Sequence, residues 1–148
     1  MAVDVATSIE IARPRTVVAA YASDPDHATQ WYSNIRSVEW HTPRPAVEGS
    51  RIAFVARFLG RRLAYTYVIR EFIPDEKFVM STEHGPFPMQ TTYTWADTPS
   101  GGTLMTLRNT GEPSGFGNLA APAMTAAMRR ANRKDLAKLK EILEQAST

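Results

Sequence analysis

The sequence predicts an α+β fold in which an antiparallel sheet of seven strands is wrapped around one long C-terminal helix. Alternation of apolar and polar residues recurs in short segments separated by turn-forming residues, which is typical of antiparallel strands with one buried face. Two helix starts follow the first of these segments, and an amphipathic pattern closes the chain. The expected order is one strand, two short helices, six strands and one long helix. No linker divides the 148 residues, so we expect a single domain over residues 1–148.

The first strand and the first helix are marked by an alternation and then by a proline. From Val3 to Ile11, every second residue is apolar or β-branched, as in a half-buried strand. Pro14 opposes further strand pairing and suits the first turn of a helix. We therefore expect a short helix over residues 14–23.

A second helix start is followed by an unusual density of aromatic residues. Asp24 has a side chain suited to capping a helix, and Pro25 needs no N–H partner in the first turn. The segment then carries Trp31, Tyr32 and, shortly after, Trp40. Large aromatic side chains normally belong to a core, so their gathering raises the question of whether they surround other side chains or a space.

Extended segments make up the middle of the chain, and a long helix ends it. The further strands are expected at residues 37–42, 51–59, 62–72, 77–84, 89–96 and 103–110. The helix is expected over residues 119–146. Its apolar stripe contains Ala121, Met124, Met128, Ala131, Leu139, Ile142, Leu143 and Ala146. An antiparallel sheet with one apolar face must be covered, and this helix is the only element able to cover it.

The hairpin around Gly60 predicts which side chains face the helix. With the turn centred near Gly60, Phe58 pairs with Leu63. The same register pairs Phe54 with Tyr67, and a shifted turn would leave the face unchanged. Continued along the next strands, this alternation predicts an inner face that contains Phe54, Phe58, Tyr65, Tyr67, Phe78, Met80, Thr82, His84, Met89, Thr91, Tyr93, Trp95, Thr103, Met105, Leu107 and Asn109.

This inner face is apolar with a few polar tips, and two interpretations of it remain open. Small-molecule pockets have this composition, and from it we expect a cavity of several hundred cubic ångströms. A solid core whose tyrosine hydroxyls bond to backbone or water has the same composition. Asn132 and Asp135 lie within the apolar stripe of the long helix, where buried polar groups need either a structural partner or a ligand.

The mouth of such a cavity is expected near the start of the long helix. Met124 and Met128 lie one turn apart on the inner stripe, and methionine adapts to irregular shapes. Phe87 and Phe116 are the neighbouring gate candidates.

The composition excludes several classes of function. The chain has no cysteine, and its three histidines lack ligand spacing, so no metal site and no cofactor are expected. A formal charge of +2 and isolated basic pairs give no footprint for nucleic acid. No apolar run has the length of a membrane span, and the N-terminal segment alternates rather than forming a signal peptide, so we expect no stable membrane insertion and a cytoplasmic protein.

Several local patterns in this order resemble the START-like, helix-grip (SRPBCC) superfamily, in its polyketide cyclase/dehydrase and lipid transport branch. They are "IEIARPRTVVAAYASDPDHATQWY", "VEGSRIAF", "REFIPDEKFVM", "GPF", "GGTLMTL" and "MRRANRKDLAKLKEILE". The resemblance covers nearly the whole chain and implies a deep cavity between a seven-stranded sheet and the last helix. It also implies that Trp31 is mostly structural, near the closed side of the cavity. The family's glycine-rich loop is matched only by "RPAVEGS", which has one glycine, so phosphate contact there has no support.

The function expected from the residues and the resemblance together is binding of a small hydrophobic molecule, such as a lipid, a polyketide or another aromatic or isoprenoid compound. The expected ligand-binding residues are Phe54, Phe58, Tyr65, Tyr67, Met80, His84, Phe87, Tyr93, Trp95, Met124 and Met128. The alternative is an enzyme of the polyketide aromatase/cyclase type that uses tyrosine and histidine in the cavity as acid and base. His84 is then the candidate catalytic residue, because imidazole exchanges protons near neutral pH. The oligomeric state stays open.

Overall fold

The computed structural model describes residues 2–117 and 119–146 and contains the expected elements in the expected order. The strands are β1 (Val3–Ile11), β2 (Ile35–Trp40), β3 (Arg51–Phe58), β4 (Arg61–Ile73), β5 (Lys77–His84), β6 (Met89–Asp97) and β7 (Thr103–Gly111). The helices are α1 (Arg15–Ala22), the 3₁₀ turn η1 (Pro25–His27), α2 (Ala28–Trp31) and α3 (Ala121–Gln145). The expected second helix is thus split into a 3₁₀ turn and a single α-helical turn.

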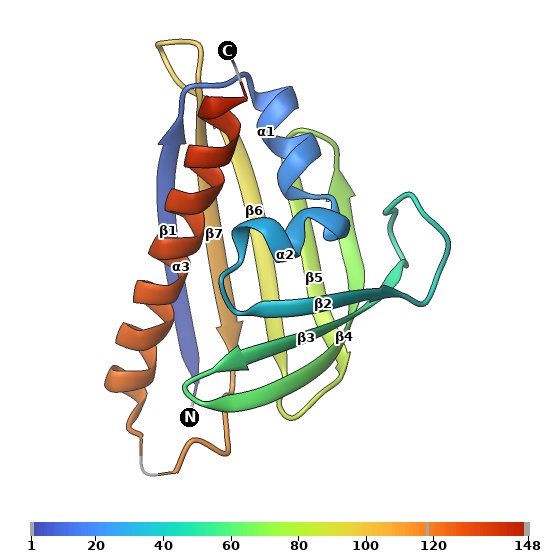
Figure 1. The fold of residues 1–148 in the computed structure, drawn as a ribbon, viewed down its shortest axis with the longest axis vertical. Coiled ribbons are helices and arrows are strands. Elements are labelled where there is room, and N and C mark those ends of the chain that lie inside the picture. The colour runs from blue at the N-terminus through green and yellow to red at the C-terminus, as the bar shows by residue number, and fades with distance from the viewer. Residues whose placement is uncertain (1, 118, 147–148) are drawn as a thin grey trace.

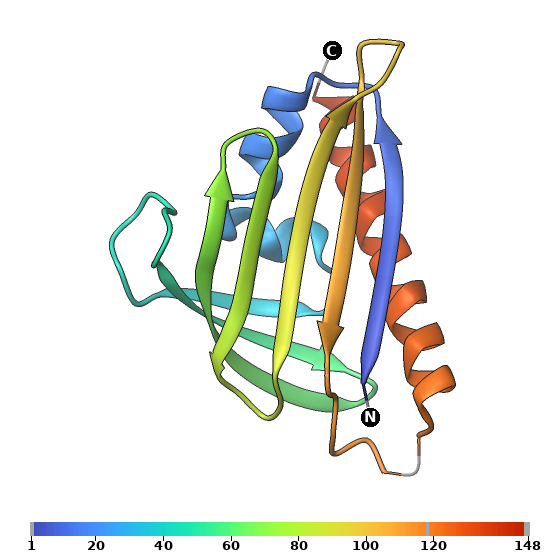
Figure 2. The same cartoon turned by 180° about the vertical axis from the view of Figure 1, so that it is seen from behind.

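The strands form one antiparallel sheet in the order β1-β7-β6-β5-β4-β3-β2. The sheet curves strongly, so that β2 and β3 cross in front of the other strands beside α3 (Figure 1). Seen from behind, no helix covers the convex face (Figure 2). All helices lie on the concave side, and this confirms the α+β arrangement of a sheet around a C-terminal helix.

The long helix α3 buries one stripe of its surface against the sheet. Pro122 stands in its first turn, where a missing N–H costs nothing. The buried residues of α3 are Met124, Met128, Asn132, Asp135, Leu136, Leu139 and Leu143. Four of the eight predicted stripe residues, Met124, Met128, Leu139 and Leu143, are in this buried set, together with the two polar residues expected inside the stripe. Leu136 is buried although the prediction did not include it, and Ala121, Ala131 and Ile142 are half-buried. The predicted last member, Ala146, is exposed.

The β3–β4 hairpin has the predicted faces but a different register. Its turn consists of Leu59 and Gly60, which both have positive φ angles, as in a two-residue hairpin turn of type I′. Phe58 therefore pairs with Arg61 rather than with Leu63. The register differs by two residues from the expected one, and because side chains in a strand alternate with period two, every residue keeps its face.

The described part of the chain has no helix that is long and apolar enough to cross a membrane.

Candidate functional site

A pocket lies between α3 and the concave face of the sheet. Its volume is about 160 Å³, smaller than the several hundred cubic ångströms expected from the sequence. The lining residues are Tyr32, Asn34, Ile35, Phe54, Ala56, Phe58, Leu63, Tyr65, Tyr67, Met80, Phe87, Met89, Thr91, Asn109, Pro113, Phe116, Met124, Met128, Ala131, Asn132 and Asp135. They come from distant parts of the chain, since strands of the sheet, the loops and α3 each contribute.

The expected ligand-binding residues fall into two groups in the structure. The pocket is lined by Phe54, Phe58, Tyr65, Tyr67, Met80, Phe87, Met124 and Met128. His84, Tyr93 and Trp95 are not among the lining residues. The first of these lies outside the core, and the other two lie within it.

The expected inward position of His84 is wrong. Thr66 on β4 pairs with His84, whereas the next residue, Tyr67, pairs with Thr82. Glu83 is therefore an extra residue in β5, and this bulge shifts the alternation by one position. His84 turns to the outer face beside Thr66 and is exposed. Because His84 does not line the pocket, its imidazole is not placed to act there as an acid or a base.

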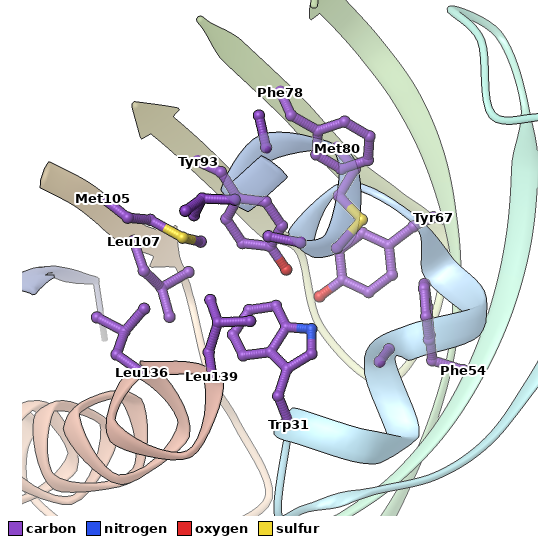
Figure 3. Close-up of a cluster of buried hydrophobic side chains, with 14 of the residues drawn as sticks. Trp31, Phe54, Tyr67, Phe78, Met80, Tyr93, Met105, Leu107, Leu136 and Leu139 are labelled. Carbon is purple, nitrogen blue, oxygen red and sulfur yellow. The ribbon is translucent and has the colours of Figure 1, made fainter. Parts of the chain in front are cut away.

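Tyr93 and Trp95 face inward but belong to a solid part of the core. The ring of Tyr93 stacks on Phe78 at a centroid distance of 5.5 Å and lies 5.7 Å from the ring of Trp31. Figure 3 shows the indole of Trp31 packed between Tyr93 and the α3 side chain Leu139. Trp31 is 1% exposed, in agreement with its expected structural role. At this end, the aromatic residues surround other side chains, and the space begins beyond them.

The boundary between the solid core and the pocket is a pair of tyrosines. The hydroxyls of Tyr32 and Tyr93 are hydrogen bonded to each other. Tyr32 lines the pocket, and Tyr32 and Tyr93 together line a smaller hollow of about 20 Å³. Burial raises the pKa of Tyr93, and burial raises that of Tyr32 well above its ordinary value. Both hydroxyls therefore stay protonated at neutral pH.

At the end of the pocket near the loop that precedes α3, aromatic side chains meet an arginine. Phe116 packs edge to face on Phe58 and on Phe87, at centroid distances of 6.0 and 5.8 Å. The guanidinium of Arg61 lies 5.4 Å from the ring of Phe116 and donates to the carbonyl of Ser114. Arg61 thus joins the β3–β4 turn to the loop that precedes α3, at the bottom of Figure 1. The two predicted gate residues, Phe87 and Phe116, lie side by side here.

A row of polar groups crosses the pocket wall from β4 to α3. Tyr67 is its member on β4, and burial raises the pKa of Tyr67 to about 12. The hydroxyl of Thr91 donates to Oδ1 of Asn109 at 2.8 Å. Nδ2 of Asn109 donates in turn to Oδ1 of Asn132 at 3.2 Å. All four side chains line the pocket, so an otherwise apolar wall has one polar strip.

Asp135 is the titratable carboxyl group of the pocket. It is 2% exposed, and its Oδ1 accepts hydrogen bonds from the backbone N–H and the hydroxyl of Ser33, at 3.0 and 3.1 Å. Burial raises the pKa of Asp135 from 3.8 to about 6, and the two bonds from Ser33 oppose this shift. Such a carboxyl changes its protonation state within one or two pH units of neutrality, whereas a solvated one does not.

The pocket residues outside the predicted ligand-binding set include both apolar side chains and several polar ones. Asn132 and Asp135 carried a signal, because polar residues inside an apolar helical stripe need partners. Thr91 and Asn109 were expected on the inner face but not in a site. Tyr32 had no such signal, because a single helical turn leaves the direction of its following residue undetermined.

Within residues 2–117 and 119–146, no three histidine, aspartate or glutamate side chains gather in a way that would hold a metal ion. The arrangement provides an apolar chamber, several neutral hydrogen-bonding groups and one carboxyl.

The sequence matches a family model over nearly the whole chain. A family model described as polyketide cyclase / dehydrase and lipid transport matches residues 2–144. None of the curated proteins matches the chain in sequence.

Solved structures share the fold at low sequence identity. A protein from Thermus thermophilus superposes with a TM-score of 0.84 at 20% identity, covering 99% of this chain and 100% of its own. A START superfamily protein from Mycobacterium smegmatis superposes with a TM-score of 0.83 at 13% identity, covering 97% of this chain and 98% of its own. The Zhui aromatase/cyclase from a Streptomyces species superposes with a TM-score of 0.80 at 13% identity, covering 100% of this chain and 97% of its own. At these identities the likeness establishes the helix-grip fold.

Proposed function

Because this chain belongs to the polyketide cyclase/dehydrase and lipid transport family, we propose that it binds a small, largely apolar molecule in the pocket between α3 and the sheet. The observation that carries the proposal is the pocket itself, which lies inside an otherwise packed core and has apolar walls with one polar strip. Ligand pockets commonly combine apolar walls with a few directional polar groups. A cavity of about 150 Å³ with apolar walls holds a ligand of about one aromatic ring, so the ligand, or the part of it that enters, is of that size.

The methionines give a direct measurement of binding. Met80, Met89, Met124 and Met128 line the pocket, whereas Met105 is fully buried elsewhere in the core. In protein with ¹³C-labelled methionine methyl groups, titration with α-methylstyrene, a planar apolar probe, should shift the four pocket signals and leave that of Met105 in place.

Filling the pocket should abolish this binding. Ala56 lines the pocket from β3, so Ala56→Phe places a ring in the space that the probe needs. We expect the affinity for α-methylstyrene to fall at least about tenfold, the equivalent of about 1.4 kcal/mol. The matched control is Ala64→Phe, because Ala64 lies exposed on the outer face of the adjoining strand. Unchanged affinity in Ala56→Phe, or no shift of the pocket methionines in the wild type, would contradict the proposal.

A second candidate function is acid–base catalysis, as in an aromatase/cyclase, and one observation favours it. Asp135 is a buried carboxyl in the pocket with a pKa of about 6, and a general acid or base works best when its pKa is close to the operating pH. Tyr32 supplies a neutral hydroxyl on the same wall. The candidate that the sequence offered for this role, His84, lies outside.

The test of this second function is turnover of a linear poly-β-ketone thioester, followed by the appearance of an aromatic product. Asp135→Asn keeps the shape and the acceptor for Ser33 but removes the proton exchange. If Asp135 is the acid–base group, the variant should lose about a hundredfold or more in rate, the usual contribution of one such group. Equal rates in both proteins, or no turnover by the wild type, would leave binding as the function.

A further inference from the structure

The row of hydrogen bonds along the pocket wall ends in a donor without a partner. Each group in the row donates to the next, from Thr91 through Asn109 to Asn132. Asn132 is 5% exposed, and its Nδ2 is buried without a hydrogen-bond partner among the described residues. A buried donor without a partner costs about 1–3 kcal/mol, so a sequence that keeps one has to supply a partner by other means.

The position of Asn132 separates it from the other buried donors without a partner. The indole nitrogens of Trp31 and Trp95 also have none in the described part of the chain, but neither side chain lines the pocket. Asn132 does line it. Met128, four residues earlier on the same face of α3, lines it too. A methionine side chain adjusts its shape readily, so the pocket wall beside Asn132 can change shape around a ligand.

Resting on the proposed binding function, we infer that the ligand carries a neutral carbonyl oxygen that accepts a hydrogen bond from Nδ2 of Asn132. The acceptor is neutral for two reasons. The carboxyl of Asp135 lines the same pocket one helical turn away, and no lysine or arginine is among the lining residues of the described chain. A ligand carboxylate at this place would lose its hydration without gaining a cation.

Three probes of the same planar shape test the inference. Acetophenone has a ketone oxygen where α-methylstyrene has a methylene group, and benzoate has a carboxylate. Their affinities are measured by titration of the labelled methionine methyl groups at neutral pH. In Asn132→Leu, the affinity of acetophenone relative to α-methylstyrene should fall about 2- to 12-fold, which corresponds to one hydrogen bond. The comparison of ratios removes the difference in hydrophobicity between the two probes.

The control variants separate the amide of Asn132 from its surroundings. Arg133→Leu places the same new residue on the exposed face of α3, outside the pocket lining, and should leave the ratio as it is. Asn132→Leu also deprives Nδ2 of Asn109 of its acceptor, so Asn109→Leu combined with Asn132→Leu removes both amides. The affinity of acetophenone relative to α-methylstyrene should be low in Asn132→Leu and in the double variant. If this ratio falls only in the double variant, the hydrogen bond comes from Asn109, and the role of Asn132 is overturned.

A measurement on the wild type keeps the test independent of how the variants fold. The side-chain amide protons of Asn132 should move downfield on addition of acetophenone and not of α-methylstyrene. Benzoate should bind at least about tenfold more weakly than acetophenone, because its charge loses hydration. Binding of both neutral probes with unmoved amide protons and an unchanged ratio would overturn the carbonyl inference and leave ligand binding intact. Tight benzoate binding would overturn the neutral acceptor, and failure of every probe would overturn the proposed function as well.

Discussion

Trp31→Ala should lower the free energy of unfolding by about 3–5 kcal/mol, the range observed when a large aromatic side chain is removed from a core. Trp31 is 1% exposed, and its ring centroid lies 4.1 Å from that of Tyr32 and 5.7 Å from that of Tyr93. It ends the single turn of α2, which is too short to be stable without tertiary contacts. The loss should therefore loosen α2 and Tyr32 as well as leave a cavity.

Urea unfolding followed by circular dichroism measures this effect, and two variants serve as controls. Trp31→Phe keeps most of the packed ring, and because the indole N–H has no partner among the described residues, it loses no hydrogen bond. Trp40→Ala removes the same side chain from β2, where Trp40 is half-buried and bonded to Asp26 at the surface. We expect about 1–2 kcal/mol there. Similar losses for Trp31→Ala and Trp40→Ala would show that the closed end of the core is not packed as described.

The free energy of unfolding of the wild type should fall relative to Asp135→Asn as the pH rises from about 4 to about 7. The pKa of Asp135 is about 6 in the folded protein, above its ordinary 3.8, so the folded state holds the proton more tightly than the unfolded chain does. This contribution is complete below a pH of about 4 and is lost as the pH passes through about 6. The difference in pKa between the folded and the unfolded state corresponds to a change in the free energy of unfolding of up to about 3 kcal/mol. Urea unfolding of both proteins at several pH values measures it, and all other groups cancel in the comparison.

Asp26→Asn provides a control of opposite sign. The hydrogen bond from Arg44 lowers the pKa of Asp26, so that carboxylate stabilises the folded protein above its unfolded pKa, and the contribution is lost in acid. The wild type should therefore lose stability relative to Asp26→Asn only below a pH of about 4. A difference between wild type and Asp135→Asn that does not change between pH values of about 4 and about 7 would mean that Asp135 titrates as a solvated carboxyl.

Local sequence patterns predicted the elements and their faces because these depend on neighbouring residues. Alternation in the strands and the three- and four-residue spacing in α3 each follow from backbone geometry alone. Residues such as Phe54, Tyr67 and Met128 therefore lie on the expected side, and they line the pocket. Their part in binding a ligand stays a prediction.

Register depends on contacts between distant segments, and there the local patterns failed. The turn at Leu59 and Gly60 moved the hairpin register by two residues without effect on the faces. The bulge at Glu83 moved the alternation by one and sent His84 to the outside. A shift of two residues keeps each side chain on its face of the sheet, and a shift of one residue moves it to the other face. A single extra residue in β5 therefore removed His84 from the pocket as a candidate catalytic group.

By itself, the sequence determined the class of fold, a sheet around a terminal helix, and the apolar character of the face that the sheet turns towards that helix, because these follow from residue periodicity and from the resemblance of its local patterns to a known superfamily. Only the tertiary structure decided which inward side chains fill the core and which border the pocket. Tyr93 is covered by Trp31 from α2, whereas Asn132 on α3 meets Asn109 on β7. Such neighbours come from segments far apart in the chain, so their contacts depend on how the whole sheet curves, and no local pattern encodes the extent of that curvature.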